Sequence, residues 1–333
     1  MPHYFIYGLD LYSDQHLPGL LPMPEKVSIT STTRLWFGPL PEKMQALVDE
    51  KGTNADWFTG SRLIEKVKIR SIRQGMYFCL SYDDGSQFFL DRSGTQIWVT
   101  WQKNLLLEDI ITYLVGPILG FVLRLKGLIC LHASAIAVDG QAVAFAGESH
   151  SGKSTTAAAL AHMGYPVLSD NIVALVAENG HFLALPAYPH IRLRTESVAA
   201  IYGHPEALPL ISSAQPDWDK RYLDLRGEGQ GFQTEPLPVA AIYHLKERVA
   251  DEKAPFIEEL SLLPAKLVIS ENTYKRYMLD DTMLLRELAG IDNLVEQVPV
   301  LQVTPHQSTR LLNLMCERIL ASFRTVQKRN LAK

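Results

Sequence analysis

The fold of this chain is decided by residues 142–161, which read AVAFAGESHSGKSTTAAALA. An apolar strand, a loop bounded by Gly147 and Gly152, and an alanine-rich helix follow one another, and every fixed position of the pattern G-x-x-x-x-G-K-[ST] is occupied. Glycines let the backbone turn tightly and approach an anion without a Cβ in the way. The N–H groups of such a loop and the positive end of the next helix bind anionic oxygens. The stretch therefore predicts a nucleotide-phosphate site, the plain alternative being a glycine-rich turn from strand to helix.

The polar residues of the loop have expected tasks. The pattern assigns the Lys153 ammonium to the β- and γ-phosphates and the Ser154 hydroxyl to Mg²⁺. The predicted cofactor-binding residues are those of the whole loop, namely Gly147, Glu148, Ser149, His150, Ser151, Gly152, Lys153, Ser154 and Thr155.

Composition narrows the class of protein. The 333 residues suffice for two ordinary domains, and 47% hydrophobic with 20% charged residues is typical of a soluble globular protein. A net charge of −4 gives no electrostatic reason to expect a nucleic-acid partner. The three widely spaced cysteines argue against a disulfide framework or a zinc site. Together with a start that lacks a signal-peptide pattern, they predict a cytoplasmic protein.

The chain is expected to divide into two domains. Residues 1–105 are rich in aromatic and branched side chains, with turns at Asp83-Asp84-Gly85 and Arg92-Ser93-Gly94, and predict a β-rich domain for packing or partner binding. Residues 106–127 predict a connecting core helix, because the uncharged run 110–123 is too short to span a membrane. Residues 128–328 form the predicted domain that carries the loop, and residues 329–333 a basic tail.

A hairpin is predicted immediately before the loop. Asp139-Gly140 lies between two apolar runs, which is a strong signal for a two-residue turn. If Val138 pairs with Gln141, His132 lies opposite Gly147, at the mouth of the loop. A histidine beside phosphate can serve as a charge or an orienting partner. The alternative is a polar end of a half-buried strand.

A carboxylate is expected on the other side of the loop helix. The helix ends at Gly164, and Val167-Leu168 is a short strand that should run parallel to the strand before the loop. Ligands collect at the carboxyl ends of such strands, so Asp170 is expected near the loop. There it can hold Mg²⁺ or accept a hydroxyl proton. The alternative is an ordinary turn aspartate.

The remaining elements follow from local patterns. A second hairpin is predicted around Asn179-Gly180. Lys220-Arg221, followed by the glycine-containing run 226–231, suggests cations for a transferring phosphate beside a closing loop, or else a solvated charged pair. Further expected segments are a strand at 239–245, helices at 262–270 and 281–297, a strand at 298–303, and a long helix from Pro305 to about Thr325.

Residues 131–171 together resemble the catalytic core of the HPr kinase/phosphorylase family. The resemblance rests on Leu131-His132-Ala133-Ser134, the glycine loop and Asp170-Asn171, in that order. It is greater for the HPr-kinase-like proteins encoded with peptide natural products, among them the lasso-peptide kinases, and it extends over most of 128–320. The resemblance implies an α/β fold with a phosphoenolpyruvate-carboxykinase-like P-loop core and a possible homo-oligomer.

The resemblance also implies a chemistry, which is ATP-dependent phosphorylation of a serine hydroxyl. By position, Lys153 and the loop amides hold the phosphates, while Ser154 and Asp170 hold Mg²⁺. Asp170 is the expected general base or metal-linked carboxylate, with His132 beside it, and Arg221 is a further candidate catalytic residue.

Two departures from the family pattern bear on the substrate. Asn171 stands where the family has a second aspartate, which removes a charge from the expected metal site. The Glu-x-x-Gly signature of the true HPr kinases is missing, since the chain reads Pro186-Ala187-Tyr188-Pro189 in that region. A peptide or small protein other than HPr is therefore the expected acceptor. The alternatives are a nucleotide-responsive binding protein without transfer activity and a small-molecule kinase.

Overall fold

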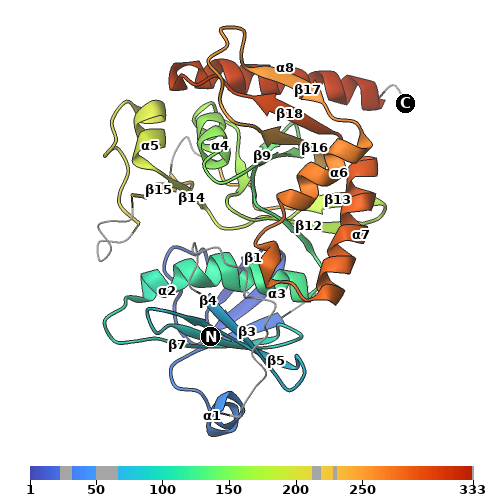
Figure 1. Cartoon of the computed structure of the whole chain (residues 1–333). Helices are drawn as coiled ribbons and strands as arrows, with labels where there is room; N and C mark the ends of the chain where they lie inside the picture. The colour runs from blue at the N-terminus through green and yellow to red at the C-terminus, as the bar shows by residue number, and fades with distance from the viewer. Residues whose placement is uncertain (23–31, 50–66, 212–218, 228–230, 332–333) are drawn as a thin grey trace. The chain divides into compact units, whose positions relative to one another are not determined.

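The computed structural model describes residues 1–22, 32–49, 67–211, 219–227 and 231–331. They form a mixed α/β protein with two compact units (Figure 1). The first unit comprises Met1–Leu128 and Lys275–Arg286, and the second comprises Ile129–Tyr274 and Glu287–Lys333. Among the described helices, none is both long enough and apolar enough to cross a bilayer.

The first unit is built on a seven-stranded sheet with the order β1-β2-β3-β7-β6-β5-β4. Its β3 pairs in parallel with both β2 and β7, and the other neighbours are antiparallel. The strands are β1 (His3–Ile6), β2 (Leu9–Ser13), β3 (Thr32–Phe37), β4 (Val67–Ile72), β5 (Tyr77–Tyr82), β6 (Gln87–Asp91) and β7 (Gln96–Thr100). The turns predicted at 83–85 and 92–94 are confirmed, because they join β5 to β6 and β6 to β7.

Helices cover both faces of this sheet (Figure 1). On one face lies a continuous helical segment made of α2 (Leu107–Tyr113), a π-helical turn (Leu114–Ile118) and α3 (Leu119–Leu125). Phe121 of α3 packs edge-on against Phe78 of β5. On the other face, α1 (Glu42–Asp49) places Leu47 against Cys79 and Phe89. The predicted core helix is thus a layer of the first unit.

The run from Tyr4 to Leu11 contains a turn that the sequence does not signal. The chain reverses at Tyr7-Gly8 and pairs β1 with β2. Both turn residues have positive φ, 53° at Tyr7 and 75° at Gly8. Tyr7 is an unusual residue in this conformation, which is why its sequence gives no turn signal.

The second unit contains a nine-stranded sheet with the order β11-β9-β10-β16-β13-β12-β8. Its β18 pairs with the second half of β16, and β17 pairs with β18. The strands are β8 (Ile129–Leu131), β9 (Ala133–Val138), β10 (Gln141–Ala146), β11 (Val167–Ser169), β12 (Val173–Glu178), β13 (His181–Ala184), β16 (Leu237–Leu245), β17 (Phe256–Glu259) and β18 (Val300–Thr304). A separate pair, β14 (His190–Leu193) and β15 (Arg221–Asp224), accompanies α5 (Thr195–Tyr202).

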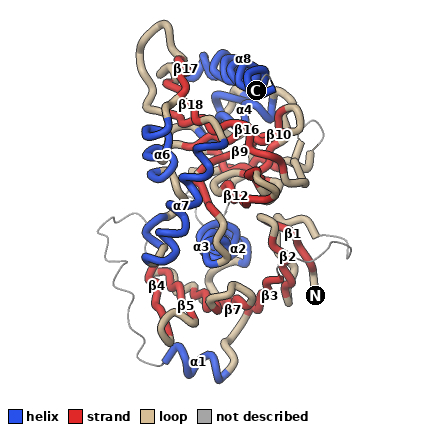
Figure 2. The backbone as a smooth tube through the Cα atoms, turned by 90° about the vertical axis from the view of Figure 1, so that its right-hand side faces the viewer, coloured by secondary structure: helices blue, strands red, loops and turns tan. Residues whose placement is uncertain are grey.

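Two hydrophobic layers lie on opposite faces of the sheet (Figure 2). One layer joins the strands to α4 (Lys153–His162) and α8 (Leu312–Leu331), with Ala158 and Phe323 buried in it. The other joins them to α6 (Leu262–Glu271) and to the part of α7 (Asp281–Gln297) that belongs to this unit, with Ile269 and Leu294 buried. This sandwich holds the carboxyl ends of β10 and β16 side by side.

Both predicted hairpins of the second unit are confirmed. In the first, Gln141 pairs with Val138 and the register continues to Ala146 opposite Ala133. Its turn residues have φ of 49° at Asp139 and 75° at Gly140, the signs that a type I′ turn requires. The strand after the loop helix is parallel to β10 as predicted, since β9 is antiparallel to both β10 and β11 and lies between them.

Two other expectations differ from the structure or fall outside it. The last helix begins at Leu312 and ends at Leu331, later at both ends than predicted, because residues 305–308 form a loop and Thr309–Leu311 a 3₁₀ turn. Of the expected closing loop at 226–231, residues 228–230 lie outside the described residues.

Gly147 gives a test of how closely β10 and β16 approach. Its φ is 150°, and an added Cβ would lie 2.6 Å from the Leu245 carbonyl oxygen. Gly140 also has positive φ, 75°, but nothing lies within 4 Å of its Cβ position. We expect Gly140→Ala to lower the free energy of unfolding by about 1–2 kcal/mol through backbone strain alone. Gly147→Ala should cost clearly more, measured by urea unfolding, and equal costs would contradict the close approach.

Candidate functional site

The glycine loop, residues 147–152, connects β10 to α4 as the sequence predicts. Gly147 and Gly152 have φ of 150° and 103°, values that a residue with a side chain rarely adopts. His150, at the tip, has φ of 72°. The Ser151 N–H donates to the Glu148 carbonyl at 3.1 Å and closes the turn. The loop is therefore a compact turn that leads into the N-terminus of α4.

Lys153 is folded back onto this loop. Its ammonium donates to the carbonyl oxygens of Gly147 at 2.8 Å and Glu148 at 2.7 Å, and the residue is only 7% exposed. Burial lowers the pKa of the ammonium to about 8, while the charges of Asp170 and Glu148 oppose the shift and Lys220 adds to it. The cation is thus held at the loop before any anion is present.

Asp170 is the centre of a hydrogen-bond network that joins three segments. Its Oδ1 accepts from the Ser134 hydroxyl of β9 and the Ser154 hydroxyl of α4, both at 2.7 Å. Its Oδ2 accepts from the backbone N–H of Arg192 in β14 at 3.2 Å. The carboxylate is 3% exposed. These donors replace the water that burial removes and hold the group in one orientation.

The turn after β11 aims Asp170 at α4. Asn171 has φ of 71°, in the left-handed region where asparagine and aspartate are the favoured residues with a side chain. The Ser169 hydroxyl donates to the Ile172 carbonyl and closes the same turn. Asn171 is therefore suited to the backbone conformation, whatever its side chain contributes to the site.

The oxygen atoms beside the loop suit a hard cation. Ser154 Oγ and Asp170 Oδ1 lie 2.7 Å apart, and both are oxygen ligands of the kind that Mg²⁺ prefers. In the described part of the chain, no group of three or more His, Cys, Asp or Glu side chains is placed to hold a metal ion. Mg²⁺ commonly binds through one or two protein oxygens together with water and substrate phosphates, so this pair fits it.

The predicted histidine directly precedes β9. The last pair of the hairpin is Ala133 with Ala146, and His132 and Gly147 are the next residues of the two segments, so their opposition stays a prediction. Its backbone N–H donates to the Asn272 carbonyl at 2.8 Å, and its ring lies edge-on to that of Tyr274, with 6.1 Å between ring centroids. The side chain of this segment that contacts the carboxylate is Ser134.

Cations reach the loop from β14 and the segment before β15. Arg194 Nη2 donates to His150 Nε2 at 3.2 Å. The predicted catalytic Arg221 instead donates through Nη1 to the Leu208 carbonyl at 2.7 Å and pairs in register with Leu193. The positive charge of its neighbour Lys220 contributes to the lowered pKa of Lys153. Of the predicted pair, Arg221 is therefore bonded within its own segment, while Lys220 acts on Lys153 through its charge.

Ser134 and Arg248 also belong to this site, although neither is among the predicted site residues. Ser134 is a fully buried polar residue in an apolar strand, and the hairpin register could have placed it opposite Phe145. Arg248 follows β16, and its Nη2 lies 3.3 Å from the position that a Cβ on Gly152 would take. Its approach depends on the parallel pairing of β10 with β16, for which the sequence gives no local signal.

Comparisons with known proteins find a weak structural similarity. No protein-family model matches the chain, and no curated protein does. Among solved structures, the HPr(Ser) kinase/phosphatase from Coxiella burnetii is similar, with a TM-score of 0.35 and 16% identity. The match covers 61% of this chain and 95% of that one. At this TM-score the likeness identifies neither a shared fold nor an activity.

The lowered pKa of Lys153 predicts a pH dependence of anion binding. Below about pH 8 the ammonium is charged, and above it the free protein loses that charge. An anion on the loop favours the charged form, so the affinity for inorganic triphosphate should fall as pH rises through about 8, approaching tenfold per pH unit. Calorimetry between pH 7 and pH 9.5 would measure this fall. Lys153→Met should bind weakly and without the inflection, and an inflection that persists in this variant would exclude Lys153 as its source.

Proposed function

We propose that the second unit is a phosphotransferase that moves the γ-phosphoryl group of ATP to a serine hydroxyl of a peptide or small protein. The observation that carries the proposal is the 2.7 Å contact between the Ser154 hydroxyl and the Asp170 carboxylate, beside the Lys153 ammonium on a glycine loop. A loop of N–H donors, a lysine, a hydroxyl and a carboxylate are the groups that phosphoryl transfer needs. The peptide-type acceptor rests on the sequence resemblance alone.

Each residue of the site would have a distinct role in phosphoryl transfer. The loop amides bind phosphate oxygens, and the Lys153 ammonium leaves the carbonyls of Gly147 and Glu148 for the same oxygens. Ser154 and Asp170 would hold Mg²⁺, which neutralises phosphate charge when bound. The acceptor oxygen forms a bond to the γ-phosphorus while the bond to the bridging oxygen of ADP breaks. The proton passes to Asp170 Oδ2, the oxygen with a single described donor.

A second candidate function has one observation in its favour. Asn171 occupies the position of the family's second carboxylate, which removes one acidic side chain from the place beside Asp170. A protein that binds ATP in order to change its affinity for a partner transfers no phosphoryl group, so it would not need a second carboxylate at the metal site. A small-molecule kinase would use the same site with a different acceptor.

Intact-mass spectrometry distinguishes transfer from binding. Candidate peptides are incubated with the full chain, ATP and Mg²⁺, and we expect one to gain a phosphate. Asp170→Asn keeps the shape of the side chain but removes its charge and basicity, so transfer should fall by about 10²–10⁴ while ATP still binds by calorimetry. Full transfer by this variant would refute the role of Asp170. ATP binding without transfer to any peptide would favour the binding protein.

Ser134 gives a finer test, because it acts only through Asp170. Ser134→Ala removes one hydrogen bond to a charged group, worth about 1.5–3 kcal/mol. We expect the turnover number to fall about tenfold to a hundredfold with the affinity for ATP unchanged. Thr33→Val is the matched control, since it removes an equally buried hydroxyl that donates to a backbone carbonyl in the first unit rather than to the carboxylate. Equal losses of turnover in both variants, at equal thermal stability, would exclude a specific role for Ser134.

A further inference from the structure

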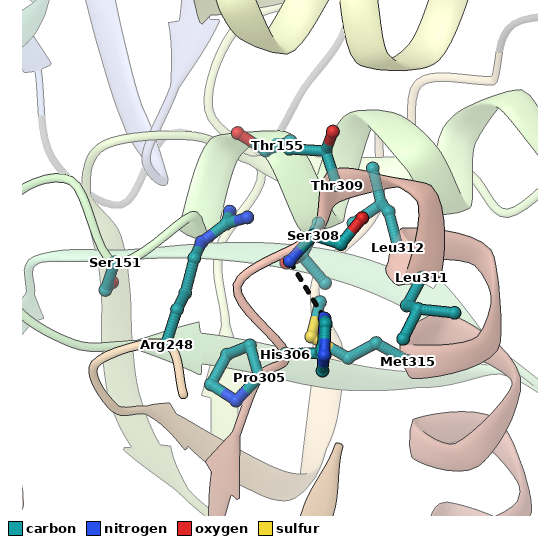
Figure 3. A pocket seen from close by; sticks show the side chains of 11 residues that line it. Ser151, Thr155, Arg248, Pro305, His306, Ser308, Thr309, Leu311, Leu312 and Met315 are labelled. Carbon is teal, nitrogen blue, oxygen red and sulfur yellow. Dashed lines mark hydrogen bonds between the residues drawn. The ribbon is translucent and has the colours of Figure 1, made fainter. Parts of the chain in front are cut away.

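A pocket lies directly beside the glycine loop, within the second unit (Figure 3). Ser151 of the loop and Thr155 of α4 form part of its wall, so the pocket continues the surface on which phosphates would lie. The other walls come from the segment between β18 and α8 and from Arg248. The lining residues are Ser151, Thr155, Thr156, Arg248, Pro305, His306, Ser308, Thr309, Leu311, Leu312 and Met315.

The lining of the pocket combines apolar and polar side chains, and Thr155 and Thr156 of α4 are buried in it. Leu312 and Met315 are buried at its base, 8% and 5% exposed. Thr309 is exposed at its edge, and Ser308 beside it is partly buried. A flat ring with apolar faces and polar edges matches this distribution, and a methionine sulfur packs favourably against such rings. These are properties of a nucleobase.

Two chain segments of the pocket are held together by backbone hydrogen bonds. The N–H of Val249 donates to the Pro305 carbonyl at 2.9 Å, and the N–H of Gln307 donates to the Val249 carbonyl at 2.8 Å. Arg248 and His306 are adjacent to these bonds, so the backbone fixes the points from which both side chains leave. The pocket is therefore formed in advance of any ligand.

Polar groups of the pocket wall are available to a ligand. His306 Nδ1 accepts the Ser308 N–H at 2.9 Å, so a neutral ring carries its proton on Nε2 and offers a donor there (Figure 3). In the described part of the structure the Arg248 guanidinium makes no hydrogen bond or ion pair, although it lies over Gly152. It can contact both a ring in the pocket and an anion on the loop.

We propose that this pocket binds the base and ribose of the nucleoside triphosphate whose phosphates lie on the glycine loop, with Arg248 contacting the ligand where the two parts meet. The inference rests on the proposed function, since it takes the loop to bind phosphate. A base pocket would make the protein bind a nucleotide more tightly than a bare polyphosphate. The residues responsible for that preference would lie far from the loop in sequence.

Calorimetric titration with two probes, ATP and inorganic triphosphate, separates the two subsites. The wild-type chain should bind ATP at least tenfold more tightly than triphosphate. Thr309→Trp places a large side chain at the rim of the pocket, at an exposed position. It should remove the preference for ATP and leave the affinity for triphosphate within about twofold. Arg248→Gln should weaken ATP binding about tenfold through loss of a charged donor.

The controls make each outcome decisive. Thr325→Trp changes an exposed threonine of α8, away from the pocket, and should leave both affinities unchanged. Thermal unfolding of both tryptophan variants establishes that they fold. A preference for ATP that survives Thr309→Trp, or a wild-type chain that binds both probes equally, would overturn the pocket while the phosphate site stands. A wild-type chain that binds neither probe would overturn the proposed function itself.

Discussion

The buried carboxylate of Asp170 is the interaction on which the site depends. A charge taken out of water costs several kcal/mol unless donors replace the lost hydration. Here the donors come from three segments: Ser134 before the loop, Ser154 after it, and the backbone of Arg192 in β14. None of these segments can shift without leaving the carboxylate short of a partner. The same bonds that stabilise the fold therefore also fix the geometry beside the glycine loop.

The surroundings of the glycine loop are positively charged, although the chain as a whole carries a net negative charge. The chain has a net charge of −4, yet cationic side chains from three other segments approach the loop that carries Lys153. Arg194 contacts His150, Arg248 lies over Gly152, and Lys220 raises the cost of charging Lys153. Such a concentration of like charge is unfavourable in an empty site and favourable once an anion neutralises it. This electrostatic argument, rather than overall charge, favours a polyphosphate ligand.

The sequence predicted best what a few neighbouring residues decide. Asp139-Gly140 specifies a type I′ turn, and because strand pairing is periodic, this one turn also fixes the register of the hairpin as far as Ala133 opposite Ala146. Prediction was weaker where distant segments meet. The Ser134–Asp170 contact requires the pairing of β9 with β11, and the approach of Arg248 requires parallel pairing of β10 with β16. The turn at Tyr7-Gly8 was missed because tyrosine rarely adopts positive φ. The roles assigned to the site residues stay predictions.

The replacement of a second carboxylate by Asn171 bears on how a metal would arrive. One carboxylate and one hydroxyl are too few oxygen ligands for the octahedral shell of Mg²⁺, so water and phosphate oxygens must supply the rest. Under the proposed function, the metal and the nucleotide therefore bind together rather than in succession. Asn171 itself is explained by the backbone, since its φ of 71° suits asparagine and turns the chain so that Asp170 faces α4. Asn171 thus lowers the affinity for Mg²⁺ in the absence of nucleotide. It can still support the binding of Mg²⁺ together with a nucleotide, because it orients Asp170.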